Sequence, residues 1–165
     1  MAVALLARRP EGLQSVKQNL STTSPGAIVE TFPTDTSPAE LRAAFTAIRA
    51  HPSFANLKLK VAVYSVKHSS KKPFMEETYE AFTQSLEGYV GGAFAFSQEA
   101  LRMLFEQHGE GLLSEGAAKK GTLIFTGTLG ALRCSAEYAA YGAGRAGVRQ
   151  LAQSLAREMS PKVCA

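Results

Sequence analysis

Long hydrophobic runs, paired cysteines and clustered histidines are all missing from this sequence. It has no stretch of eighteen or more apolar residues, which excludes a transmembrane helix. The apolar N-terminus, residues 1–9, is too short for a signal peptide and carries its charges on the wrong side, so we expect a cytoplasmic protein. Cys134 and Cys164 have no partner at a recognisable spacing, and the three histidines are scattered. No disulfide framework and no metal site are therefore predicted.

The positive charge of the chain is modest and has no nucleic-acid motif beside it. The formal net charge is +4, the pI is about 9.2, and the densest basic run covers residues 67–72. A solvated loop explains such a run, because no groove with interleaved aromatic residues accompanies it. We expect no nucleic-acid partner. A length of 165 residues with 45% hydrophobic content predicts one domain.

Apolar runs typical of strands alternate with helical periodicity along the whole chain. Strands are predicted at residues 2–7, 27–32, 57–66 and 122–128, and helices at residues 13–20, 38–50, 76–108 and 136–159. Ser37 is the expected N-cap of the second helix, with Pro38 at its first position and Glu40 completing a capping box. Ser160 and Pro161 are expected to end the last helix. The alternation predicts an α/β fold with a parallel sheet and right-handed crossovers.

Three glycines, Gly88, Gly91 and Gly92, lie inside the long helical stretch at residues 76–108. They suggest either a phosphate-binding loop or close packing of this helix against another. Because they follow no strand, close helix packing is favoured. The polar connection at residues 109–120 is longer than a tight turn needs, which indicates a surface insertion.

The strongest functional signal is a hydroxyl, a phenol and a cation near the C-terminal end. Tyr141 and Arg145 are four residues apart, so on a helix their side chains share one face. Thr128 lies thirteen residues before Tyr141, at the end of the predicted strand. A phenol beside a fixed cation, with a hydroxyl facing it, is the layout of proton transfer at a carbonyl. The alternative for Tyr141 is a packed helical tyrosine without a catalytic role, as Tyr138 illustrates three residues earlier.

This layout resembles the active-site segment of the short-chain dehydrogenase/reductase family, in which a Ser ends a strand and Tyr-x-x-x-Lys opens the next helix. Here Thr128 stands at the Ser position and Arg145 at the Lys position. The resemblance implies that Tyr141 is the general acid or base, that Thr128 orients the substrate oxygen and that Arg145 supplies a charge beside the phenol. The Lys of the family also holds the nicotinamide ribose, so Tyr141 and Arg145 are candidate cofactor contacts. The catalytic Asn of the family corresponds to Tyr89, and of the four positions only Tyr141 is unchanged.

The resemblance extends to earlier positions and implies a Rossmann-like domain that binds NADP. Residues 3–9 look like the second strand and its cofactor-selecting turn, where Arg8 and Arg9 imply the 2′-phosphorylated cofactor. Asp35 looks like the adenine-contacting acid, and Ser65 begins the segment that in the family lines the cofactor. The structural alternatives are that the two arginines are only solvated and that Asp35 only shapes a turn.

A glycine-rich turn after a first strand receives the cofactor phosphates in this family, and this sequence has no such turn. The chain begins at the element that resembles the second strand and ends before the strands that follow the active-site helix. We therefore expect an incomplete Rossmann-like domain over residues 1–165, the product of a truncated or incompletely assigned reductase rather than a deliberately shortened protein. Direct pairing of the neighbouring strands, a strand from another chain, or partial folding would resolve the missing central strand.

Two functions are consistent with these features. The leading hypothesis is an oxidoreductase that transfers a hydride between NADP(H) and a small carbonyl or alcohol substrate. The alternative is a catalytically degenerate family member that acts only as an interaction or dimerisation module, through the helices at residues 76–108 and 136–159. The changed residues Tyr89 and Arg145 and the missing glycine-rich turn favour this alternative for the chain as given.

Overall fold

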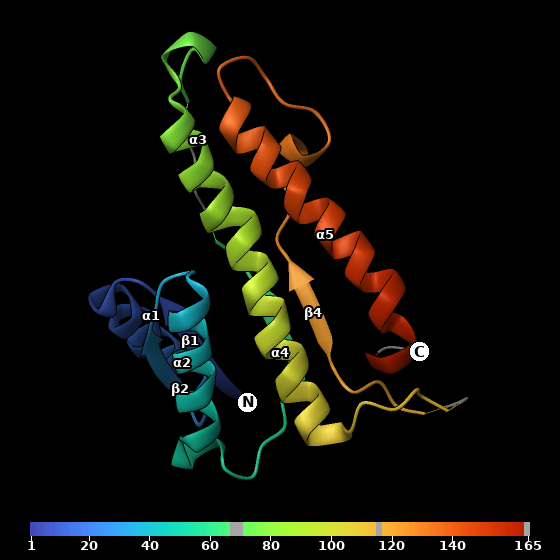
Figure 1. The fold of residues 1–165 in the computed structure, drawn as a ribbon. Helices are drawn as coiled ribbons and strands as arrows, with labels where there is room; N and C mark the ends of the chain where they lie inside the picture. Colours follow the sequence, from blue (N-terminus) through green and yellow to red (C-terminus); the bar gives the residue numbers. More distant parts are fainter. Residues whose placement is uncertain (67–70, 115–116, 164–165) are drawn as a thin grey trace. The chain divides into compact units, whose positions relative to one another are not determined.

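A computed structural model describes residues 1–66, 71–114 and 117–163 of the chain (Figure 1). Strands and helices alternate, and both strand pairs are parallel, as the sequence predicts for an α/β protein. The chain divides into two compact units, Met1–Lys58 and Leu59–Ala165, and each is described by itself.

The first unit is a two-stranded parallel sheet with covering helices. Its elements are β1 (Ala2–Ala7), α1 (Pro10–Thr23), β2 (Ile28–Pro33), α2 (Pro38–Ala50) and the 3-10 turn η1 (Pro52–Phe54). The two strands pair from Ala2↔Ile28 to Ala7↔Pro33, and α1 contacts both of them. Apolar residues at strand and helix spacing form the core, namely Leu13, Val29, Phe32, Leu41, Phe45 and Ile48. Burial of this set drives the two helices onto the sheet.

The start of α2 follows the sequence prediction, except that the Ser37 N–H donates to Asp35 and not to Glu40. The Ser37 hydroxyl accepts a hydrogen bond from the Glu40 N–H at 3.4 Å, and Pro38 lies in the first turn. The Ser37 N–H donates to Asp35 Oδ1 at 2.7 Å, where the predicted capping box would use Glu40. Asp35 therefore shapes the turn that leads into α2.

The second unit is also built on a two-stranded parallel sheet. Its elements are β3 (Val61–Tyr64), η2 (Phe74–Glu76), α3 (Tyr79–Leu86), the π-helical turn η3 (Glu87–Gly91), α4 (Gly92–His108), β4 (Thr122–Phe125), η4 (Leu129–Ala131) and α5 (Ala139–Val163). The strands pair from Val61↔Thr122 to Tyr64↔Phe125. Figure 1 shows α3 and α4 as one long helix beside α5. The helical stretch expected at residues 76–108 is thus confirmed from Tyr79 onward, with one π turn inside it.

Both strands of the second unit are shorter than expected. β3 and β4 hold four residues each, inside the predicted ranges 57–66 and 122–128. Thr128 consequently lies three residues beyond β4 rather than at the end of a strand.

The last helix differs from its prediction at both ends. α5 begins at Ala139 instead of position 136, and it runs through Pro161 to Val163, so the expectation that Pro161 ends the helix is wrong. The carbonyls of Pro161 and Val163 each accept a backbone hydrogen bond at 2.9 Å, from the N–H groups of Leu113 and Lys120. These bonds and the burial of Val163 offset the amide hydrogen that proline lacks.

The π turn η3 packs closely against α5, and the glycines that allow this contact lie in α5. A Cβ added at Gly147 would lie 2.7 Å from Val90, and one at Gly144 would lie 3.1 Å from the Tyr89 ring. A Cβ at Gly91 would meet nothing within 4 Å. The glycines of α5 therefore let η3 approach this helix.

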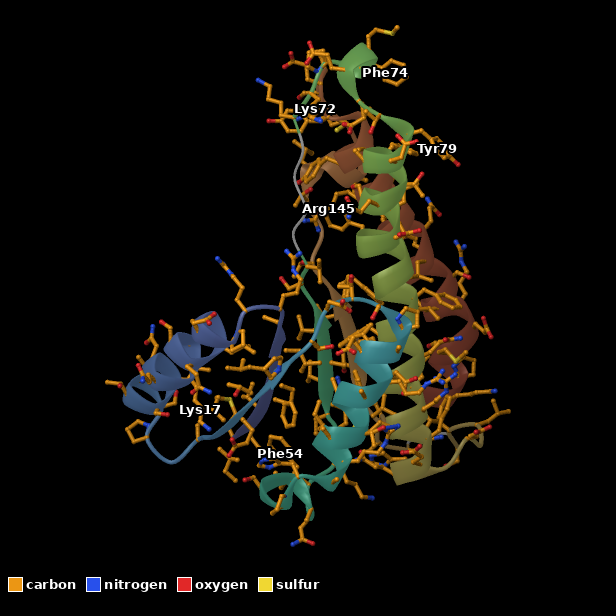
Figure 2. All side chains as sticks on the ribbon, turned by 60° about the vertical axis from the view of Figure 1, so that its left-hand side comes forward. Lys17, Phe54, Lys72, Phe74, Tyr79 and Arg145 are labelled. Carbon is orange, nitrogen blue, oxygen red and sulfur yellow. The ribbon has the colours of Figure 1, made fainter. Side chains whose placement is uncertain are left out.

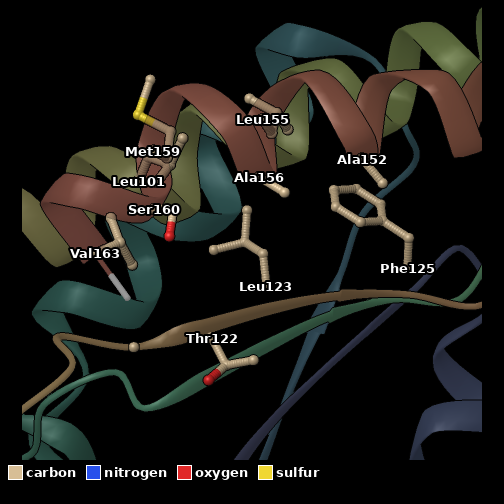
Figure 3. Close-up of a pocket in the computed structure, with 11 residues that line it drawn as sticks. Leu101, Thr122, Leu123, Phe125, Ala152, Leu155, Ala156, Met159, Ser160 and Val163 are labelled. Carbon is tan, nitrogen blue, oxygen red and sulfur yellow. The ribbon is translucent and has the colours of Figure 1, made fainter. Parts of the chain in front are cut away.

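A cavity of about 320 Å³ separates β4 from the C-terminal half of α5 (Figure 3). Leu123 and Phe125 point from the strand toward the helix, which presents Ala152, Ala156, Ser160 and Val163 to them. Its lining is largely apolar, and none of the sequence-predicted site residues contributes to it. Its two hydroxyl side chains, Thr122 and Ser160, lie among apolar residues, and no charged side chain of the described residues lines it.

Several expectations concern features that the described residues do not contain. None of the helices described is long and apolar enough to cross a membrane. In the same ranges no three His, Cys, Asp or Glu side chains gather to hold a metal ion. Each of the two described sheets has two strands from its own unit, β1–β2 and β3–β4. Cys164 and most of the basic run, residues 67–70, lie outside the described part of the chain.

Candidate active site

Thr128 and Tyr141 form the centre of the candidate site in the second unit. Their hydroxyl oxygens lie 2.9 Å apart, and either can donate the hydrogen bond. Thr128 has extended backbone angles immediately before η4, and Tyr141 lies in the first turn of α5. Thr128 is exposed and Tyr141 is partly exposed, so a small molecule can reach the pair.

The loop after β4 holds the Tyr141 ring in place. A Cβ at Gly130 would come within 2.6 Å of Tyr141 Cε1, so only glycine lets this turn lie against the ring. The Tyr138 ring contacts Tyr141 from another side, edge to face, with a centroid separation of 5.9 Å. The Ala131 N–H donates to the Thr128 carbonyl at 3.0 Å, which fixes the backbone at Thr128.

Arg145 lies one helical turn after Tyr141 and is buried, with 7% of its surface exposed (Figure 2). Its Nη1 donates to the Thr126 carbonyl at 3.1 Å, and its Cζ is 5.4 Å from the centroid of the Tyr141 ring. The buried Nε has no hydrogen-bond partner among the described residues. Arg145 thus brings a fixed positive charge to Tyr141 without a hydrogen bond to the Tyr141 hydroxyl.

Tyr89 lies behind this arrangement, in η3. It is fully buried, and the centroid of its ring is 4.6 Å from Arg145 Cζ. The structure therefore brings Tyr89 to Arg145 and keeps its ring away from solvent. A catalytic role for Tyr89, which stands at the position of the family Asn, stays a prediction.

Tyr64 lies near Tyr89 and Arg145, and the sequence patterns did not identify it. It ends β3, is buried, and donates from its hydroxyl to the Gly88 carbonyl at 2.7 Å. Burial raises the pKa of Tyr64 above its ordinary value, Tyr89 raises it further, and the charge of Arg145 acts in the opposite direction. Alternate residues of a strand point to one face of a sheet. The strand predicted at residues 57–66 was therefore the signal that could have identified Tyr64 as a buried residue near its end.

The predicted cofactor residues of the first unit lie at one end of its sheet. Arg8 and Arg9 are exposed and follow β1, while Asp35 is exposed and follows β2. Hydrogen bonds from Ser37 hold the pKa of Asp35 below its usual value, and the charge of Arg8 adds to this effect. In the second unit, Ser65 is exposed directly after β3.

A hollow of about 500 Å³ adjoins the loop that carries Tyr138. Phe74, Cys134 and Tyr138 line it together with small residues at the start of α5. Its size lies in the range of small-molecule sites. Neither Thr128 nor Tyr141 lines this hollow. At 2.9 Å from each other, their hydroxyls can bind one substrate oxygen and exchange a proton with it.

Known proteins resemble this chain in sequence and in fold. A family model for short chain dehydrogenases matches residues 1–164 of the chain. No curated protein sequence matches it significantly.

Many solved structures share the fold. A short-chain dehydrogenase from Rhodopseudomonas palustris aligns with a TM-score of 0.78 and 24% identity over 99% of this chain and 69% of its own. A short-chain type dehydrogenase/reductase from Mycobacterium ulcerans aligns with a TM-score of 0.80 and 23% identity over 96% and 54%. An NADPH-bound short chain oxidoreductase from Pseudomonas aeruginosa PAO1, described as containing an atypical catalytic center, gives 0.79 and 23% over 98% and 58%. The chain thus spans between 54% and 69% of the length of these structures.

Proposed function

Because the chain belongs to the short-chain dehydrogenase family, we propose that it serves an oxidoreductase reaction between NADP(H) and a small carbonyl or alcohol. The observation that carries this proposal is the 2.9 Å separation of the Thr128 and Tyr141 hydroxyl oxygens at an accessible place. Two hydroxyls at this distance can hold one carbonyl oxygen together. The hollow beside Tyr138 supports a small-molecule substrate.

The chemistry of the chain concerns the proton. In reduction, the Thr128 hydroxyl donates a hydrogen bond to the carbonyl oxygen, and the Tyr141 hydroxyl gives that oxygen its proton. In the reverse direction Tyr141 removes the proton from the alcohol. The fixed charge of Arg145 stabilises the negative charge left on the Tyr141 oxygen. The nicotinamide cofactor, when bound, supplies or accepts the hydride.

Arg8 and Arg9 support NADP as the cofactor. Both are exposed at the carboxyl end of β1, and two guanidinium groups suit the 2′-phosphate better than an acidic residue would. Asp35 is a less direct contact, since its Oδ1 already accepts from the Ser37 N–H at 2.7 Å. Ser65, Tyr141 and Arg145 remain the proposed contacts of the second unit.

Fluorescence titration of the purified chain with NADPH and NADH tests the cofactor. We expect micromolar binding of NADPH and weaker binding of NADH. Oxidation of NADPH with 4-nitrobenzaldehyde as the probe then tests turnover, with Tyr141→Phe as the inactive comparison. Absence of NADPH binding at millimolar cofactor would overturn the enzymatic proposal.

The second candidate function is an interaction module without catalysis. It is favoured by the burial of Arg145 and its hydrogen bond to the Thr126 carbonyl, because this geometry differs from a flexible, exposed amine. Phe94 on α4 is 51% exposed, which suits a helical contact surface. In this function the helices at residues 76–108 and 136–159 pair two copies of the chain.

Sedimentation equilibrium separates the two candidates. A dimer that Phe94→Ser dissociates, together with no binding of NADPH, would establish the interaction function alone. A monomer that binds NADPH and turns over the probe would establish the enzyme alone. For either function, a cytoplasmic location stays a prediction, and fractionation of the source cells tests it.

A further inference from the structure

The guanidinium of Arg145 lies between two tyrosine rings from different elements. Its Cζ is 4.6 Å from the centroid of Tyr89, in η3, and 5.4 Å from the centroid of Tyr141, in α5. Both distances are within the reach of cation–π attraction. Arg145 brings a positive charge to these two rings.

A buried charge needs partners that offset the loss of water. For Arg145 the contacts recorded among the described residues are the Thr126 carbonyl and the two rings, and no carboxylate is among them. One carbonyl satisfies one of the five N–H groups of a guanidinium. The ring faces therefore supply much of the compensation at this site.

The surrounding packing leaves the Tyr89 ring little freedom. Tyr89 has no exposed surface, and a Cβ at Gly144 would lie only 3.1 Å from its Cδ2 and 3.3 Å from its Cβ. Gly144 precedes Arg145, so a glycine opens α5 at the place where the ring lies. The π turn η3 and this glycine together aim the ring at the guanidinium.

We propose that Tyr89 is a positioning residue that holds the Arg145 guanidinium against Tyr141. The inference rests on the proposed oxidoreductase function and gives Tyr89 a role within it. Tyr89 acts through its ring face and contacts no substrate. An amide side chain at this position offers no such face, and a lysine at position 145 offers a point charge without the flat surface that stacks on a ring. The two residues therefore function as a pair.

The experiment compares Tyr89→Phe, which keeps the ring, with Tyr89→Leu, which removes it. NMR of protein labelled with ¹⁵N-arginine follows the Arg145 Nε–H signal, assigned by its loss in Arg145→Lys. We expect this proton upfield of other arginine side chains because it lies over a ring, in the wild type and in Tyr89→Phe alike. In Tyr89→Leu we expect the upfield shift to decrease. Turnover of 4-nitrobenzaldehyde with NADPH should fall about tenfold in kcat with little change in KM.

Gly144→Ala supplies a second test if Tyr89→Leu does not fold, since it keeps the ring and displaces it. It should reduce the upfield shift as well, whereas the matched substitution Gly91→Ala should leave the shift and the activity as they are. Circular dichroism establishes that each variant is folded.

The outcomes separate this inference from the proposed function. An Arg145 Nε–H without an upfield shift in the wild type overturns the positioning role, whatever the activity. Equal kcat values for Tyr89→Leu and the wild type overturn it too. If the wild type binds no NADPH, the proposed function fails, and the role of Tyr89 is then judged on the ¹³Cζ signal of Tyr141, which Tyr89→Leu must move and Tyr89→Phe must not.

Discussion

The hydroxyl oxygens of Thr128 and Tyr141 lie 2.9 Å apart, although one belongs to the loop after β4 and the other to the first turn of α5. Substitutions that remove one hydroxyl test whether this pair performs proton transfer. Tyr141→Phe should lower kcat by a factor of about 10² or more and leave NADPH binding nearly unchanged. Thr128→Val should also reduce turnover, whereas Thr128→Ser keeps the hydroxyl and should retain most of it. Steady-state oxidation of NADPH measures these effects, and equal rates for Thr128→Val and Thr128→Ser would contradict the role of the hydroxyl.

Gly130 should be required for the position of the Tyr141 ring. In Gly130→Ala the new Cβ would start 2.6 Å from Tyr141 Cε1, so the ring or the loop must shift. Overpacking of this kind typically costs about 1–3 kcal/mol of stability, and we expect a loss of turnover with it. Gly127→Ala is the matched control from the same loop, because a Cβ there meets nothing within 4 Å. Urea unfolding monitored by circular dichroism compares the two variants, and equal midpoints would show that the turn yields easily.

Replacing Arg8 and Arg9 by glutamine should weaken NADPH binding about tenfold or more and change NADH binding little. The reason is that a charge-assisted hydrogen bond to a phosphate contributes about 1.5–3 kcal/mol, and NADH lacks the 2′-phosphate. The double substitution Arg42→Gln and Arg49→Gln removes the same two charges from α2 and is the control for the net charge. Fluorescence titrations give the dissociation constants. Parallel losses for both cofactors would indicate that the two arginines do not select the phosphate.

The ion pair of Glu30 and Lys17 predicts a pH dependence of stability in the first unit. Lys17 Nζ lies 2.8 Å from Glu30 Oε2, and this hydrogen bond is the main reason that the pKa of Glu30 is lowered in the folded chain. A carboxyl whose folded pKa is lowered stabilises the fold above its unfolded pKa, and this contribution disappears as the pH falls through the folded value. The side chains are 34% and 25% exposed, so the contribution is at most about 1 kcal/mol.

Urea unfolding at pH 7 and at pH 3 measures that contribution. The wild type should lose more stability on acidification than Glu30→Gln, and Lys17→Met should behave like Glu30→Gln. The double variant should show no further change, because each single substitution already removes the pair. A Glu30→Gln chain with the pH dependence of the wild type would exclude the ion pair as its source.

Local sequence patterns predicted the helices and strands. They did not predict which distant segments contact one another. The four-residue spacing placed Tyr141 and Arg145 on one helical face, and the structure agrees. The approach of Tyr89 to Arg145 joins residues far apart in the sequence through a π turn and a glycine on the other helix. Helical periodicity describes one face of one helix and carries no information on which residue a second helix presents to it.

The end of α5 shows the same limit. Proline is a local signal for the end of a helix. Here α5 continues through Pro161, and its end is held by hydrogen bonds from the amides of residues 113 and 120. The sequence left two roles for Asp35, a turn residue or a cofactor contact. The hydrogen bond that Asp35 accepts from the Ser37 N–H supports the role in the turn. The role of Asp35 toward adenine stays a prediction.

The backbone bonds from Leu113 to Pro161 and from Lys120 to Val163 have a consequence for any shortening of the chain. Trimming that removes residues after Ser160 would delete both acceptors at once. The amides of Leu113 and Lys120 would then need new partners, and the connection before β4 would lose these two hydrogen bonds. The susceptibility of the connection before β4 to proteases is therefore set by the C-terminal end of α5.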